Sequence, residues 1–200
     1  TKTGPGTISW SVMSALNNAG TLNVNEGVFE LNSNVTFNNT GSVVINGASF
    51  SMVSNAIFNH NSATSVSGTG TFSSNGAQFN VNTDQVFPAT LNFSCTSQIN
   101  GPGHLTINNN FTWSGNIIGS GNLILNENGT WNGGTLERNL NVLAGKTLTL
   151  ATAANKYLAS TITNAGTIHW QDGGMGWNSG STTITNNNIF LISGNTGTGY

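Results

Sequence analysis

Acidic residues are the natural starting point for catalysis, because glycoside-cleaving enzymes use two carboxyl groups held at a fixed separation. The chain has only six: Glu26, Glu30, Asp84, Glu127, Glu137 and Asp172. Glu127 and Glu137 could form a pair on one face, and Glu137 is followed directly by the sole arginine, Arg138. The turn-like sequence GGTLERNL favours instead a solvated turn with a local ion pair of little energetic consequence. We therefore predict no catalytic residues and no enzyme activity.

Histidines and glycine-rich turns give no stronger signal of chemistry. The three histidines have no spacing typical of a metal site, and we interpret them as outward-facing strand residues: His60, His104 and His169. Gly-x-Gly pairs recur, as at Gly101/Gly103, but none leads into the helical pattern that a phosphate-binding loop requires. We predict no cofactor and no bound metal.

Tryptophans flanked by asparagine amides could form an aromatic platform for sugar rings. The candidates for such carbohydrate contact are Trp113, Trp131 and Trp177. Trp113 and Trp131 hold equivalent places in the related segments FTWSGNI and GTWNGGT. We favour the core for these two, because aromatic side chains in register also fill the interior of a repeat protein. Trp177, in the glycine-rich DGGMGWNSG, is expected to be exposed.

Threonine pairs raise a remote alternative, an ice-binding surface that matches a lattice through outward Thr-x-Thr motifs. Three such pairs occur: Thr147/Thr149, Thr161/Thr163 and Thr183/Thr185. They do not recur at one fixed period, and threonine is common on any exposed strand. We therefore favour an ordinary strand surface.

The low content of charged residues excludes several kinds of binding partner. Only 5% of the residues are charged and the net charge is −2, so neither nucleic acid nor an anionic membrane is an expected partner. No apolar run reaches the length of a membrane span, and we predict no membrane insertion. The single cysteine, Cys95, rules out an intramolecular disulfide. A polar surface built from Asn, Thr, Ser and Gly suggests, by association, a secreted protein at the cell surface.

A 21-residue repeat is the strongest feature of the sequence. Shifting residues 22–37 by 21 places onto residues 43–58 superposes the apolar positions, as with Leu22 on Val43 and Phe29 on Phe50. Within each copy the apolar residues alternate, which indicates extended strands with one face inside. Each unit therefore holds three short strands separated by turns that contain Gly or Asn.

Such a unit predicts an all-β fold, a parallel β-helix with about three short strands in each coil of roughly 20 residues. We expect one domain over residues 1–200, with an N-terminal cap at 1–17, coils at 18–192 and a tail at 193–200. Residues 7–16 could form a short capping helix. Stacked asparagines are expected to hydrogen-bond along the coils as a ladder. The alternative is an antiparallel sandwich or jelly roll, which also has many short strands.

The repeated Gly-x-Gly-Thr units, such as GTGTFSS at 68–74, and the Asn/Thr-rich strands resemble β-solenoid regions of secreted bacterial adhesins and autotransporter passengers. The resemblance implies a non-catalytic, extracellular structural or adhesive rod. We expect its ends to associate with other copies or with neighbouring repeats, because open strand edges invite pairing and low charge removes repulsion. The alternative is a β-helix that binds a glycan or, with less support, cleaves one.

Overall fold

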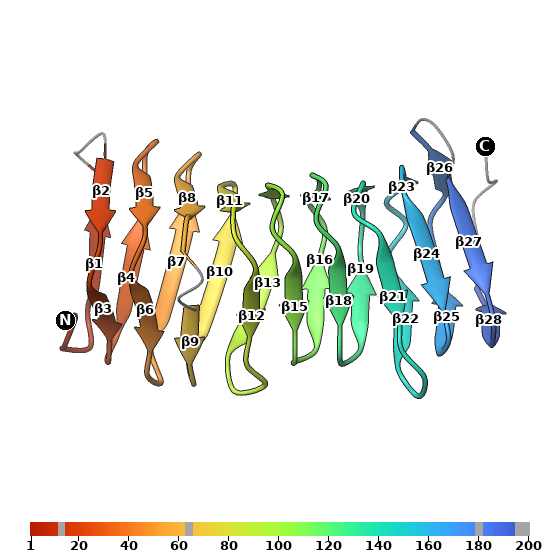
Figure 1. The fold of residues 1–200 in the computed structure, drawn as a ribbon, viewed down its shortest axis with the longest axis horizontal. Helices are drawn as coiled ribbons and strands as arrows, with labels where there is room; N and C mark the ends of the chain where they lie inside the picture. Colours follow the sequence, from red (N-terminus) through yellow and green to blue (C-terminus); the bar gives the residue numbers. More distant parts are fainter. Residues whose placement is uncertain (12–14, 63–65, 179–181, 195–200) are drawn as a thin grey trace.

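The computed structural model describes residues 1–11, 15–62, 66–178 and 182–194, which wind into a rod of stacked coils (Figure 1). The rod is a β-solenoid of about eight turns of about 21 residues, with three strands in each coil. Each strand pairs in parallel with the strand one coil away. The predicted parallel β-helix is therefore confirmed, and the antiparallel sandwich is excluded.

The coils have three sides, and the first two are continuous sheets along the rod. The first side has ten strands: β1 (Thr7–Trp10), β4 (Val28–Leu31), β7 (Ser49–Val53), β10 (Thr71–Asn75), β13 (Asn92–Cys95), β16 (Phe111–Trp113), β19 (Gly129–Trp131), β22 (Thr147–Leu150), β25 (Thr167–Trp170) and β28 (Ile189–Ile192). The second side has nine: β2 (Ala15–Asn18), β5 (Thr36–Asn39), β8 (Ile57–His60), β11 (Gln78–Val81), β14 (Gln98–Asn100), β17 (Asn116–Ile117), β20 (Gly134–Leu136), β23 (Lys156–Leu158) and β26 (Met175–Trp177).

The third side is divided into two sheets. Three strands lie at the N-terminal end: β3 (Thr21–Val24), β6 (Ser42–Ile45) and β9 (Val66–Gly68). Six continue toward the C-terminus: β12 (Gln85–Phe87), β15 (Leu105–Ile107), β18 (Leu123–Leu125), β21 (Leu140–Val142), β24 (Thr161–Asn164) and β27 (Thr183–Asn186). The Gln85 side chain spans the break by accepting from the Val66 N–H at 3.1 Å and donating to the Val66 carbonyl at 3.2 Å. The side-chain amide thus replaces the missing backbone pairing.

The core consists of like side chains stacked from coil to coil. Burial alternates along most strands, as in β5 and β8, so one residue in two faces the interior. On the nine-stranded side, the ring of Phe58 lies between those of Phe37 and Phe79, with centroids 4.8 and 5.4 Å away. The repeat detected in the sequence is therefore a repeat of core positions.

Asparagine ladders run along the outside. The Asn38 amide donates to Asn17 Oδ1 at 2.9 Å, Asn59 to Asn38 at 2.8 Å, and Asn80 to Asn59 at 2.7 Å. Each bond joins equivalent positions of successive coils, where the strand spacing of about 4.8 Å brings the amides together. The predicted ladder is confirmed, and it accounts for much of the asparagine content without a ligand.

The first coil is built from strands, so the expectation of a helix in residues 7–16 is wrong for the described part of that segment. Ile8 pairs with Phe29 and Trp10 with Leu31, which extends the two-residue alternation of β4. Residues 12–14 of the expected helix lie outside the described residues. Residues 195–200, most of the expected tail, also lie outside them.

Replacing Phe58 with alanine should lower the free energy of unfolding by about 3–5 kcal/mol, because a fully buried ring is removed from the middle of a stack. Denaturant unfolding followed by circular dichroism measures the change. Thr112→Ala, at an exposed position of β16, is the control and should cost about 0.5 kcal/mol. Equal losses in the two variants would contradict the stacked-core description.

Candidate functional site

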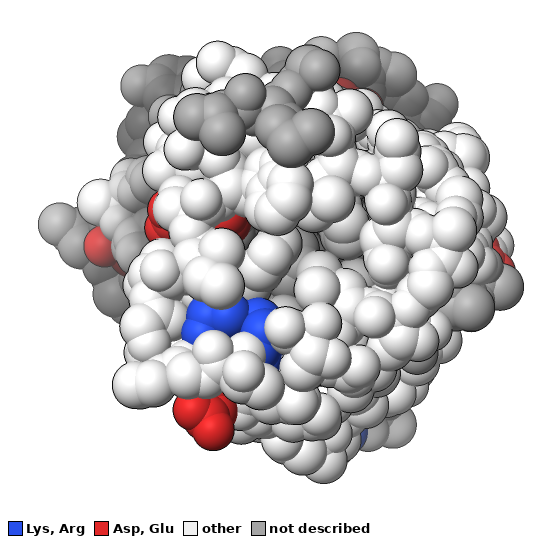
Figure 2. All heavy atoms as spheres, turned by 90° about the vertical axis from the view of Figure 1, so that its left-hand side faces the viewer, with Lys and Arg blue, Asp and Glu red and all other residues white. Residues whose placement is uncertain are grey.

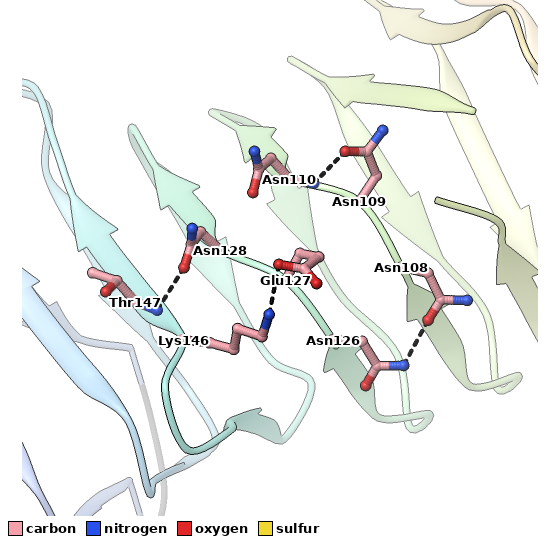
Figure 3. Close-up of polar contacts among 8 residues, drawn as sticks. All are labelled: Asn108, Asn109, Asn110, Asn126, Glu127, Asn128, Lys146 and Thr147. Atoms are coloured by element: carbon pink, nitrogen blue, oxygen red, sulfur yellow. Dashed lines mark hydrogen bonds and ion pairs between the residues drawn. The ribbon is translucent and has the colours of Figure 1, made fainter. Parts of the chain in front are cut away.

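Glu127 lies in the connection from β18 to β19, where it pairs with Lys146 (Figure 3). The Lys146 Nζ is 2.7 Å from Glu127 Oε2, and both side chains are partly exposed, at 30% and 41%. Around the pair, Asn126 donates to Asn108 at 2.6 Å, and Asn128 accepts from the Thr147 N–H at 2.8 Å. These contacts join one coil to the next, so Glu127 is part of a polar ladder.

Glu137 lies at a different corner of the coil from Glu127. Its connection runs from β20 on the nine-stranded side to β21 on the third side, whereas Glu127 lies between the third side and the ten-stranded side. The structure therefore does not bring the two glutamates together at one corner, as a catalytic carboxylate pair would require. Glu137 is exposed.

Arg138 is buried, and the interpretation of a solvated Glu137–Arg138 turn is wrong for the arginine. Only 1% of Arg138 is exposed, and its guanidinium donates to the carbonyls of Ile118, Gly103 and Gly101 at 3.0, 2.6 and 2.7 Å. Burial lowers the pKa of Arg138 to about 10. The three carbonyls belong to turns of the two preceding coils, so the arginine ties three coils together.

Two lysines, like Arg138, are buried and donate their hydrogen bonds to backbone carbonyls. Lys2 Nζ donates to the carbonyls of Gly4 and Glu26 at 2.5 and 3.0 Å, and Lys156 Nζ donates to those of Thr152, Ala154 and Asp172 at 2.7, 2.9 and 3.0 Å. Both lysines are buried, and burial lowers the pKa of Lys156. Three of the four basic residues thus satisfy backbone carbonyls at coil corners, which leaves Lys146 as the partly exposed cation of the described residues.

The histidines do not share one environment. His104 is exposed and accepts from the Asn122 N–H at 3.0 Å, and His169 is 2.6 Å from the Ser193 hydroxyl. His60 is fully buried, which corrects the prediction that it faces outward. Its inward position follows from the alternation in β8, where Phe58 and His60 are both buried. The described residues contain no cluster of three His, Cys, Asp or Glu side chains that could hold a metal ion.

His60 is a buried imidazole whose polar atoms are not satisfied by hydrogen bonds within the described part of the chain. Neither ring nitrogen has a hydrogen-bond partner of good geometry among the described residues. Burial lowers the pKa of His60 to about 4, a shift that the nearby Asp84 backbone partly opposes. The imidazole is therefore neutral in the folded state across the physiological pH range.

The three candidate tryptophans divide into two groups. Trp113 and Trp131 are 1% and 0% exposed and stack on each other with ring centroids 5.8 Å apart, so they cannot reach a sugar in the folded state. Gly129 makes room for them, because a side chain there would meet Leu125 and Trp113. Trp177 is 57% exposed. It pairs with buried Leu158, so its exposure results from its place at the end of the stack.

The threonine pairs fall on two different sides of the rod. Thr161 and Thr163 in β24 pair with Thr183 and Thr185 in β27. Thr147 and Thr149 lie in β22, on the ten-stranded side. Two of the three pairs therefore form one patch on the third side.

The two ends of the rod are the surfaces where core positions reach solvent. At the N-terminal end, Ile8 is 46% exposed and Trp10 is half-buried. At the C-terminal end, Ile192 is 56% exposed and Phe190 is half-buried. All four continue the inward rows of the ten-stranded sheet, because Ile8 and Trp10 pair with buried residues of β4, and Phe190 and Ile192 pair with Ile168 and Trp170 of β25.

Comparisons with known proteins leave the function open. No protein-family model matches the sequence, and no curated protein or solved structure shows significant similarity to it. The resemblance to bacterial surface adhesins therefore depends on the repeat pattern and the composition alone. No helix among the described residues is long and apolar enough to cross a membrane.

Lowering the pH from 6.5 to 4 should destabilise the fold by up to about 3 kcal/mol through His60. In this window the unfolded chain takes up a proton on the imidazole and the folded chain does not, so stability falls as the pH falls. Chemical unfolding at several pH values measures the effect. His60→Leu should lose this part of the pH dependence; an unchanged profile in that variant would contradict the prediction.

Arg138→Met should lower the free energy of unfolding by about 3 kcal/mol or more, because three turn carbonyls lose a charged donor. Arg138→Lys keeps the charge with fewer donors and should lie between the wild type and Arg138→Met. Glu137→Gln is the matched neighbour and should change stability by about 0.5 kcal/mol or less. A large loss in Glu137→Gln would instead support an ion pair between the two side chains.

Proposed function

We propose that the protein is a non-catalytic, extracellular structural or adhesive rod whose terminal coils stack on coils of another copy or of neighbouring repeats. The observation that carries the proposal is the pair of open apolar ends. Among the described strands, β1 forms one edge of the ten-stranded sheet and β28 the other, so each end presents backbone groups that no described strand pairs. Half-exposed core side chains accompany these strands at both ends.

The two edges are complementary in register. If β1 of a second copy pairs with β28 as β28 pairs with β25, Ile8 lies on Phe190 and Trp10 lies on Ile192. Both partners occupy the same inward rows, so the apolar core would continue across the joint. Burying such apolar surface contributes about 25 cal/mol for each Å² removed from water.

The other two sides complete the joint differently. On the third side, Lys2 pairs with Val24 on the outer edge of β3, so the segment around Lys2 acts as the first strand of this side. In the joint, this segment of the second copy would lie beside β27, the last strand of the third side. On the nine-stranded side, the described strands leave the width of one strand between β26 and the second copy's β2. Exposed Trp177 and half-buried Leu16 border this space. Neighbouring residues of a longer chain would fit there as a further strand.

Low charge favours the association. Figure 2 shows the N-terminal end of the rod, where most of the visible described surface carries neither acidic nor basic side chains. The whole chain has a net charge of −2. Repulsion between approaching ends is therefore weak. The uncharged polar surface also supports the proposed extracellular setting.

Ile192→Asp should weaken self-association by about 30-fold or more, because stacking would bury an unpaired carboxylate. Sedimentation velocity over a range of concentrations, with electron microscopy of the assembled material, measures this effect. Leu191→Asp is a matched control: it is similarly exposed, at 46%, but faces outward on the same strand. A wild-type chain that stays monomeric at high concentration, or equal effects of both substitutions, would contradict end-to-end stacking.

A further inference from the structure

One outward row of side chains runs nearly the length of the nine-stranded sheet. Register pairing places its members on successive strands from β8 to β26, the step from Asn116 to Thr135 following from the pair Ile117–Leu136: Ile57, Gln78, Gln98, Asn116, Thr135, Tyr157 and Gly176. The residue that follows each of the first six is buried, so this row faces away from the core. Six strand spacings of about 4.8 Å make the row about 29 Å long.

The first hollow on this row has a volume of about 360 Å³, within the size range of ligand sites. It lies where the corner between the first two sides shortens. Counted between register-equivalent positions of the two sides, four residues intervene at 32–35 and 53–56, then three at 75–77 and two at 96–97. Asn34 and Asn55, from the two longer turns, line one side of the hollow. Gly76, where the connection becomes shorter, also lines the hollow and has no side chain to fill it.

The amides at this hollow differ from those of the ladders. Asn34, Asn55 and Gln98 line the hollow, and their side chains make no hydrogen bond within the described part of the chain. Amides of the adjoining row bond to each other, as Asn59 does to Asn38. Each unpaired amide offers two donors and an acceptor beside the apolar surface of Ile57. This combination suits a ligand with several hydroxyl groups on an apolar frame.

The second hollow lies at the other end of the same row, beside Tyr157. It has a volume of about 70 Å³ and is lined by Tyr157, Asn155 and Gly176, among others. A side chain at position 176 would come within 2.9 Å of the Tyr157 ring, so the ring lies across the glycine. Tyr157 is 38% exposed, and its hydroxyl is 3.4 Å from the Asn155 amide. An exposed ring beside an amide can pack on the C–H face of a sugar and bond its hydroxyls.

We propose that this row binds an extended neutral polysaccharide lying parallel to the rod axis. None of the described residues that line either hollow is charged, which disfavours an acidic glycan. Hydroxyl recognition by the amides at Gln98 and sugar stacking on Tyr157 would hold one chain at two points along the row. This site lies on a side of the rod, so end-to-end stacking would leave it accessible.

Isothermal titration calorimetry with cellohexaose, mannohexaose and chitohexaose, and with hexagalacturonate as the acidic comparison, tests the proposal. At least one neutral hexasaccharide should bind. Gln98→Leu and Tyr157→Ala should each weaken that binding about tenfold or more, while Tyr157→Phe, which keeps the ring, should retain it within about threefold. Gly176→Ala should also weaken binding, because the added methyl group displaces the ring.

Thr112→Ala, an exposed position on the ten-stranded side, is the control and should leave binding unchanged. Thermal unfolding confirms that each variant is folded, and Gly176→Ala provides a second variant if Tyr157→Ala unfolds. The proposal is overturned if no neutral hexasaccharide binds or if hexagalacturonate binds as tightly. It is equally overturned if the folded Gln98→Leu and Tyr157 or Gly176 variants bind like the wild type.

Discussion

Backbone hydrogen bonding between successive coils is the constraint on which the rest of this structure depends. Except at the break between β9 and β12, each strand is held about 4.8 Å from its equivalent one coil away, so a side chain can only lie above a side chain at the same register. Inside, this gives the stack of Phe37, Phe58 and Phe79, and outside it gives the asparagine ladder. The same constraint leaves core side chains such as Ile8 and Ile192 partly exposed at the two ends, because no further described coil stacks on them.

The regular positions could be predicted from the sequence because alternation and a 21-residue shift report directly on strands and register. The ladder followed from the same pattern, since asparagine recurs at equivalent places. The first coil was harder, because TISWSVMSAL contains none of the Gly or Asn residues that mark the other turns. Ile8 and Trp10 reveal the strand only when they are placed on Phe29 and Leu31.

The positions that sequence reasoning missed are polar residues buried in the interior of the solenoid. Arg138 and His60 suggest a surface, because charged and polar side chains are seldom fully buried. Arg138 is buried because turn carbonyls of two other coils, at Gly101, Gly103 and Ile118, converge on it, and no local pattern reports that convergence. Likewise, the hollow at Gln98 depends on connection lengths in several coils. Its unpaired amides look like any others in an asparagine-rich chain.

Coil length varies along the rod. On the ten-stranded side, paired residues are 21 apart at the first step (Thr7 and Val28), 18 apart in the middle (Ser94 and Thr112), and 22 apart at the last (Thr167 and Ile189). The middle coils are therefore shorter in sequence than the end coils, and the two end coils have nearly equal numbers of residues. Two end coils of nearly equal length can stack on each other without leaving apolar side chains of the longer coil exposed to water. A filament of such units would alternate longer and shorter coils, with one stretch of short coils per copy.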